Sequence, residues 1–190
     1  MKKRRILIAA VLVIGLALLA SGALAYFVAE GTATSTVTTG GVSIRVSAWG
    51  DEARTVAIPT EGVHGILPGT SVTEIVEVTG EEGSAPAWLR VRVEKSITLA
   101  DDVEGEPDLD LVVLDGLNTD AWTDGGDGWY YYNTALTAGE TTEALFTAVR
   151  FAPAMGNEYQ GAEARVAVSA QAVQTAHNGN SALEAAGWPA

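Results

Sequence analysis

Apolar and polar residues alternate along most of this chain with a period of two, which is the period of a β-strand. The clearest examples are Val42–Ala48 (V-S-I-R-V-S-A) and Ala87–Glu94, where almost every second residue is apolar. Because successive side chains of a strand point to opposite faces, such segments predict strands with one buried face. Further strands are predicted over residues 54–58, 71–79, 109–114, 129–132, 143–153 and 163–176.

Turn signals separate these segments. Leu67–Thr70 (L-P-G-T) combines a proline, which presets φ, with a glycine, which accepts positive φ. Residues 101–110 and 115–128 are rich in Asp and Gly and are expected to be loops. Short strands without long helical crossovers predict an all-β, antiparallel β-sandwich. A short helix is expected over Ala182–Ala186, capped by Asn180-Ser181.

The start of the chain departs from this alternation and has the layout of a secretory signal peptide. Lys2–Arg5 form a basic start, and residues 6–20 carry no charge. Ala23 and Ala25 are the small residues that a signal peptidase reads. We therefore expect an N-terminal signal helix, cleavage before Tyr26, and a secreted product.

A transmembrane helix is the alternative for the leader, because residues 6–29 are 24 uncharged residues and could span a bilayer core of about 30 Å. With cleavage, the expected division is a signal peptide over 1–25, an N-terminal segment over 26–41, and one β-sandwich domain over 42–190. Contact with a membrane is then expected only through the uncleaved signal segment.

The composition narrows the range of partners. The leader holds four of the 11 basic residues and none of the 24 acidic ones, so seven basic residues remain against 24 acidic, a net charge of −17. Such a surface repels nucleic acid and anionic lipid, which are therefore not expected as partners. The chain has no cysteine. Its stability must therefore come from a packed core or from neighbouring chains rather than from disulfides.

Residues that could carry chemistry are few, so no enzyme activity and no cofactor are expected. The two histidines, His64 and His177, lie 113 residues apart, without an H-E-x-x-H motif, and no serine lies in a G-x-S-x-G elbow. A calcium site is the one metal hypothesis, because Asp120, Asp124 and Asp127 lie in a glycine-rich loop that would let carboxylates converge. The alternative is that these residues serve turn geometry.

The segment Tyr26–Thr39 is rich in β-forming residues, with five threonines and a single charge at Glu30. It could donate a strand to the sheet of another chain, or fold back as an edge strand of its own domain. Gly40 and Gly41 would form the hinge between this segment and the first core strand. The expected strand-donating residues are Tyr26, Phe27, Val28, Thr32, Thr34, Thr36, Val37 and Thr38.

Several short motifs resemble one family of exported proteins. They are A-L-A-Y-F at 23–27, T-G-G-V-S-I at 39–44 within residues 32–46, I-L-P-G-T at 66–70, P-A-W-L-R-V-R-V at 86–93, W-Y-Y-Y-N at 129–133, L-T-A-G-E at 136–140 and L-F at 145–146. Through them the chain resembles the camelysin/TasA-type proteins, which include fibre subunits of the biofilm matrix.

The resemblance implies a jelly-roll-like sandwich, processing by a dedicated signal peptidase, and polymerisation by strand donation from the mature N-terminus. The implied partners are copies of the chain or related fibre subunits, at the cell surface or in the extracellular matrix. The donor role is carried over to residues 26–39 only. The chain departs from the family at Val28 and Ala29, where acidic residues are usual, and in having Lys95 as its one lysine after the leader.

Two other functions remain open from the sequence. A secreted monomeric binding module would use Trp122 and Trp129, expected to be exposed, to hold a carbohydrate or a host protein. Parts of the family are classed as metallopeptidases, but no zinc-peptidase motif supports that activity in this chain. The expected function is therefore a secreted structural subunit of extracellular fibres.

Overall fold

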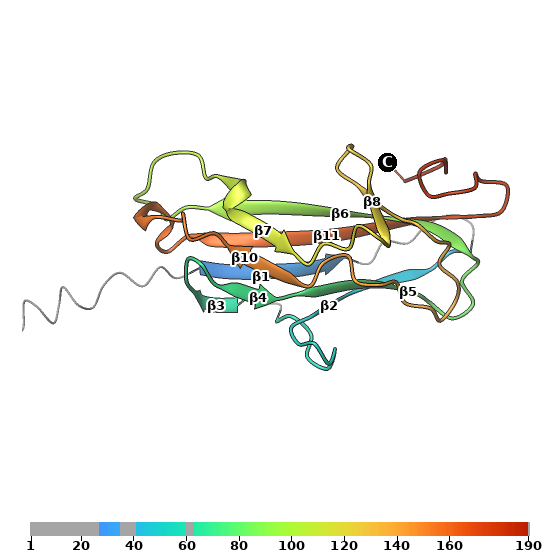
Figure 1. The fold of residues 1–190 in the computed structure, drawn as a ribbon, viewed down its shortest axis with the longest axis horizontal. Coiled ribbons are helices and arrows are strands. Elements are labelled where there is room, and N and C mark those ends of the chain that lie inside the picture. Colours follow the sequence, from blue (N-terminus) through green and yellow to red (C-terminus); the bar gives the residue numbers. More distant parts are fainter. Residues whose placement is uncertain (1–26, 35–40, 60–62, 190) are drawn as a thin grey trace, which may run out of the picture.

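The computed structural model describes residues 27–34, 41–59 and 63–189, and for residues 27–34 and 63–66 it describes the backbone alone. Most of these residues lie in strands or in the turns between them, which confirms the all-β prediction (Figure 1). The elements in chain order are β1 (Phe27–Thr34), β2 (Ile44–Trp49), β3 (Val63–Ile66), β4 (Ser71–Thr73), β5 (Ile75–Gly80), β6 (Ala87–Thr98), the 3₁₀ helix η1 (Leu109–Leu111), β7 (Val112–Asp115), β8 (Trp122–Asp124), β9 (Tyr130–Tyr132), β10 (Ala148–Phe151), the 3₁₀ helix η2 (Asn157–Tyr159) and β11 (Glu163–Gln174).

One sheet of six strands has the order β3-β1-β11-β6-β9-β8. Its centre is the antiparallel pair of β11 and β6, which runs over twelve residues from Glu163 opposite Thr98 to Gln174 opposite Ala87. Both strands alternate between buried and more exposed residues along much of their length. Because one face of these strands contacts the core, the alternation in the sequence correctly predicted them.

The opposing strands form the ladders β2-β5 and β4-β10-β7. The segment before β10 joins them, because the Leu145 amide donates to the Val76 carbonyl and the Thr142 amide donates to the Val78 carbonyl, both at 2.9 Å. On its other side the Thr147 amide donates to the Asp115 carbonyl at 3.0 Å. These bonds connect the two ladders into one continuous layer.

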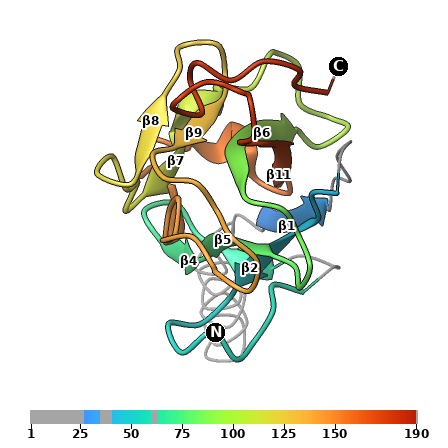
Figure 2. The ribbon, with the colours of Figure 1, turned by 90° about the vertical axis from the view of Figure 1, so that its right-hand side faces the viewer.

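The buried apolar side chains of the described residues form one cluster. It lies between the two layers of strands, which Figure 2 shows from one end. Each layer contributes fully buried side chains, and the largest of them are Trp122, Phe146, Phe151, Leu89 and Leu145. Burial of side chains of this size supplies the main stabilising term of a domain that has no cysteine.

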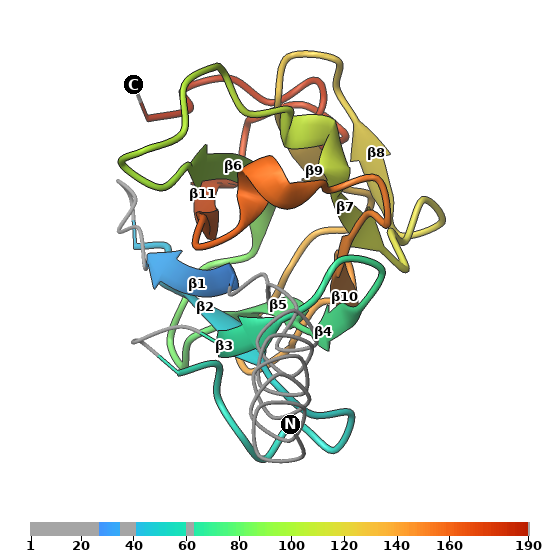
Figure 3. The same cartoon turned by 90° about the vertical axis from the view of Figure 1, so that its left-hand side faces the viewer.

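The strand β1 departs from the antiparallel pattern, because it pairs in parallel with β11. Parallel neighbours need a long connection, and here the whole domain between Thr34 and Glu163 provides it. β1 also lies close to β2, so that it sits where the two layers meet (Figure 3). Between the described strands of residues 42–189 the predicted antiparallel pairing is confirmed, and the parallel ladder belongs to the N-terminal segment.

Three local predictions were wrong in whole or in part. Residues 122–124, expected to lie in a loop, form the short strand β8. The strand expected over residues 54–58 is reduced to a bridge between Ala57 and Trp49. The residues before it are bent, because Asp51 Oδ1 accepts the Thr55 and Val56 amides at 2.8 and 2.7 Å, and Arg54 takes a φ of 57°. The expected helix at Ala182–Ala186 is a turn in which the Glu184 amide donates to the Ser181 carbonyl at 3.2 Å.

The predicted signal peptide lies outside the described residues, including Ala23, Ala25 and Tyr26. The same is true of Thr36, Val37, Thr38 and Gly40. Over the part of the chain that the structure describes, no helix has the length and apolar character needed to cross a membrane.

Candidate functional site

The first candidate site is the slot that β1 fills between β3 and β11. On one side β1 pairs in parallel from Val28 opposite Glu163 to Thr34 opposite Ser169. On the other side it pairs antiparallel with β3 through a register shift. β1 is therefore an interior strand of its own sheet, and β3 forms the edge.

Four of the predicted donor residues lie in this slot: Phe27, Val28, Thr32 and Thr34. Gly41, the second half of the predicted hinge, has a φ of +79°, which a residue with a side chain rarely adopts. Its carbonyl accepts the Ala85 amide at 3.0 Å. Gly41 therefore fixes the point at which the chain enters the second layer.

Three successive core-side positions of β1 carry very small residues. Ala29, Gly31 and Ala33 are in register with Ala164, Val166 and Val168, which are buried on the core face of β11. Because hydrophobic stabilisation grows with the apolar area removed from water, these three positions contribute little of it. Main-chain hydrogen bonds therefore supply much of what holds β1 in the slot.

The predicted calcium loop is the turn between β8 and β9. The Gly126 amide donates to Asp124 Oδ1 at 2.8 Å, and the Trp129 amide donates to Asp127 Oδ1 at 3.1 Å. The Tyr131 hydroxyl donates to Asp127 Oδ2 at 2.7 Å, and this bond is the main reason why the pKa of Asp127 lies below its usual value. Both carboxylates thus stabilise their own turn.

Asp120 lies apart from that turn, just before the start of β8. It lines a polar groove between this segment, the end of β9 and the segment before β10. Among the residues whose placement is described, no group of three or more His, Cys, Asp or Glu residues is arranged to hold a metal ion. The calcium site stays a prediction, with Asp120, Asp124 and Asp127 as its residues.

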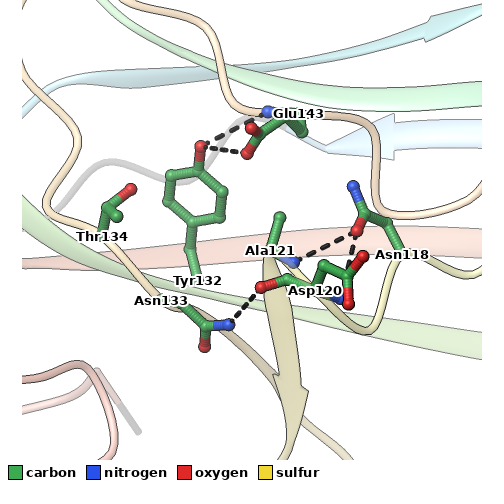
Figure 4. Close-up of a pocket in the computed structure, with 7 residues that line it drawn as sticks. All are labelled: Asn118, Asp120, Ala121, Tyr132, Asn133, Thr134 and Glu143. Carbon is green, nitrogen blue, oxygen red and sulfur yellow. Dashed lines mark hydrogen bonds between the residues drawn. The ribbon is translucent and has the colours of Figure 1, made fainter.

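The polar groove beside Asp120 has a volume of about 370 Å³ (Figure 4). The Tyr132 hydroxyl donates to Glu143 Oε2 at 2.9 Å, and the Asn133 side-chain amide donates to the Asp120 carbonyl at 2.9 Å. Its lining residues are Asn118, Asp120, Ala121, Tyr132, Asn133, Thr134 and Glu143. The lining includes two carboxylates and no basic side chain, so it favours a neutral or cationic group over an anion.

Trp122 lies beneath this groove and is not the exposed residue that the sequence led us to expect. It is only 2% exposed, its ring centre lies 4.8 Å from that of Tyr132, and its Nε1 donates to the Glu143 carbonyl at 3.1 Å. The binding-module hypothesis was therefore wrong to place Trp122 on the surface. Trp129, in contrast, is half-buried on the outer face of the sheet.

A stack of aromatic rings and arginines covers the outer face of β6. The Arg90 guanidinium carbon lies 4.1 Å from the ring centre of Trp129 and 4.6 Å from that of Trp188. Arg92 follows along β6, 5.8 Å from the Trp129 ring centre. This cluster was not predicted from the sequence, because its members come from segments about 40 and 98 residues apart.

Hydrogen bonds from β6 attach the C-terminal segment to the sheet. The Trp88 indole Nε1 donates to the Asn178 carbonyl at 2.8 Å. The Asn178 side chain in turn accepts the Ala186 amide at 2.8 Å and donates to the Ala186 carbonyl at 3.0 Å. These bonds close the segment into a loop that presents Trp188 to Arg90.

The basic side chains after the leader all have partners. Arg45, Arg54, Arg92, Arg150 and Arg165 form ion pairs with Glu81, Glu77, Glu94, Asp115 and Glu163. Lys95 donates to the carbonyls of Leu109 and Val112. The large excess of acidic residues is therefore not neutralised within the chain.

Glu74 is the one buried carboxyl group without a salt-bridge partner in the described part of the chain. It lies between β4 and β5, is 4% exposed, and its Oε1 has no hydrogen-bond partner. Burial raises its pKa to about 7. Such a group is a destabilising feature at alkaline pH and a candidate for pH sensitivity.

Comparison of this chain with models of known protein families, with curated proteins and with solved protein structures finds no match.

Proposed function

We propose that this chain is an exported structural subunit with a jelly-roll-like sandwich, which builds extracellular fibres by inserting β1 into the sheet of the next copy. The observation that carries the proposal is the placement of β1, an N-terminal strand that lies between β3 and the last strand of the domain, antiparallel to β3 and parallel to β11. A strand at the end of a chain can leave such a slot without unthreading the rest of the fold.

The small core-side residues of β1 support exchange between copies. A strand that buried large side chains would leave a costly cavity in the core, whereas Ala29, Gly31 and Ala33 would leave little apolar volume unfilled. The main-chain hydrogen bonds that β1 makes to β11 can be made equally well by β1 of another copy. Exchange of an identical element between chains has a low net free-energy cost for this reason.

The direction of the strand exchange, from the donor strand of one copy to the slot of the next, favours a filament. Each chain has one donor strand and one acceptor slot, so the contact is head to tail rather than two-fold symmetric. Unless the rotation between subunits closes a ring, such a contact extends without limit. Copies of the chain, or related subunits with the same slot, are therefore the proposed partners.

The charge of the chain adds a condition to assembly. A net charge of −17 after the leader makes neighbouring subunits repel each other. Screening acts over about 8 Å at physiological ionic strength, so filaments should form more readily as salt increases. The proposal includes removal of the leader by a dedicated signal peptidase and requires no catalytic activity.

The test is to express the full chain, recover the exported protein, read its N-terminus by mass spectrometry, and image it by negative-stain electron microscopy. We expect the exported chain to begin at Tyr26 and to form regular filaments.

Two further samples test the donor strand. A variant lacking residues 27–34 should form no filaments, and a synthetic peptide of residues 26–39 should slow the growth of filaments from the intact protein. A scrambled peptide is the matched control. Filaments that persist in the deletion variant would reject strand donation.

Glycan binding is the second candidate, favoured by the half-buried Trp129 and Trp188 on one outer face. Aromatic side chains at a surface are typical of recognition sites. In that case the exported protein stays monomeric, and Trp129→Ala weakens its retention on a polysaccharide column.

A further inference from the structure

The register between β1 and β11 pairs an acidic residue with a basic one. Glu30 is the one charged residue of β1, and it stands opposite Arg165 of β11. Arg165 lies on the exposed face of β11, between the buried residues Ala164 and Val166. We propose that Glu30 and Arg165 form the charge pair that selects the incoming strand and its register, with a second copy of this chain as the partner. The inference rests on the strand-donation function proposed above.

Every neighbouring register loses this match. A shift of two residues in one direction sets Glu30 opposite Glu163, where two carboxylates repel. The same shift in the other direction sets it opposite the uncharged Ala167. A shift of one residue exchanges the two faces of the strand and sets Glu30 opposite Ala164 or Val166, which face the core.

The charge of Arg165 can discriminate between donor strands, because β1 is the neighbouring strand that carries a charged residue opposite it. On the β6 side Arg165 is paired with Ser96, which carries no charge. On its own strand it is 3.7 Å from Glu163, an exposed pair that contributes little by itself. A donor strand with a basic residue at the position of Glu30 would therefore be rejected by repulsion, which is how like charges across a sheet exclude a wrong partner.

The pair predicts a specific behaviour of charge-reversed chains. In Glu30→Arg the donor and the acceptor are both basic, and in Arg165→Glu both are acidic. In either chain, a donor strand meets a like charge in the slot of an identical copy. The donor strand of each variant meets an opposite charge in the slot of the other variant. A mixture of the two therefore has matched pairs at every contact between alternating subunits.

The experiment measures filament growth of the exported protein by light scattering and electron microscopy at low salt. The chains are wild type, Glu30→Arg, Arg165→Glu, the double reversal, and an equimolar mixture of the two single reversals. Arg45→Glu and Glu82→Arg are matched controls, because they change the net charge equally at exposed positions outside β1 and β11. Circular dichroism melting of each chain checks that it folds.

We expect each single reversal to slow growth by about tenfold or more, since attraction across the strands becomes repulsion. The double reversal and the mixture should both restore growth, while the two controls grow like wild type. Added salt should reduce the differences.

The failures are distinguishable. No filaments from the wild-type chain would reject the proposed function itself. Wild-type growth in both single reversals would reject the charge pair and leave strand donation standing. Recovery in the double reversal but not in the mixture would show that the pair acts within one chain, and would overturn its role in selecting a second copy.

Discussion

Arg90 lies face to face with Trp129, with 4.1 Å between the guanidinium carbon and the ring centre. Its Nε and Nη2 also donate to Gln171 Oε1, at 2.9 and 2.6 Å. A single side chain thus joins β6 to β11 and, through Trp188, to the C-terminal segment. Because a planar guanidinium can stack on the rings while two of its nitrogens donate to one oxygen, a lysine at this position cannot reproduce the combination.

We expect Arg90→Lys to lower the free energy of unfolding by about 1–3 kcal/mol, through the loss of stacking and of paired hydrogen bonds. Urea unfolding followed by tryptophan fluorescence measures the change. Arg92→Lys is the control, because Arg92 is more distant from the ring and about half exposed. Equal effects of the two substitutions would show that the stack around Arg90 contributes nothing specific.

The two tryptophans of the β8–β9 region should respond very differently to removal. Trp122 is buried and fills the core beneath Tyr132, so Trp122→Ala is expected to cost about 3–5 kcal/mol of stability. Trp129 is half-buried on the outer face, so Trp129→Ala should cost less, about 1–2 kcal/mol. Denaturant titrations of both variants make the comparison. A larger loss at Trp129 would contradict the core position of Trp122.

The sequence was a good guide wherever a strand has one face on the core. The alternation in β2, β6 and β11 reflects direct contact of every second residue with other apolar side chains, so the pattern could be read without the fold. Trp122 was misjudged because its neighbours along the chain are Asp, Thr and Gly. Those neighbours describe the turn that follows β8, whereas its burial depends on distant residues.

Local hydrogen bonds explain why the strand predicted around Arg54 does not form there. The residues around it have strand-like composition, yet the Asp51 carboxylate accepts two amides of the same segment and bends it into a turn. The parallel partner of β1 was equally hidden, because pairing between the two ends of a chain leaves no local signal. The stack around Arg90 has the same long-range origin.

The ion pair between Arg54 and Glu77 gives a test of the turn. Arg54 Nε donates to Glu77 Oε1 at 2.6 Å, and the Glu77 side chain is 8% exposed while that of Arg54 is 46% exposed. Removing Arg54 leaves a carboxylate unpaired in a largely buried position. Since the arginine is half in solvent, we expect Arg54→Ala to cost a moderate amount, about 1–2 kcal/mol.

The double variant Arg54→Ala/Glu77→Gln separates the charge from the packing. It should recover part of the loss, because the glutamine carries no charge that needs a partner. Thermal melting of the wild type, the two single variants and the double variant measures this. A double variant less stable than either single variant would show that the ion pair is not the reason for the loss.

Glu74 should make stability depend on pH in a direction opposite to that of a paired carboxylate. Its pKa in the folded chain is about 7, above the ordinary value of 4.5, so the folded state binds the proton more tightly than the unfolded state. The stabilising effect of the bound proton is complete below about pH 4.5 and is lost as pH rises towards 7. A shift of this size corresponds to about 3 kcal/mol.

Glu74→Gln keeps the shape of the neutral side chain and removes its titration. The variant should therefore gain stability relative to wild type as pH rises from 4.5 to 8, while the two chains should be similar at pH 4.5. Urea unfolding of both chains across this range isolates the Glu74 contribution, because the other acidic residues titrate in both. A difference that stays constant with pH would mean that Glu74 has the same pKa in the folded and the unfolded chain, and therefore that its burial has not shifted its pKa.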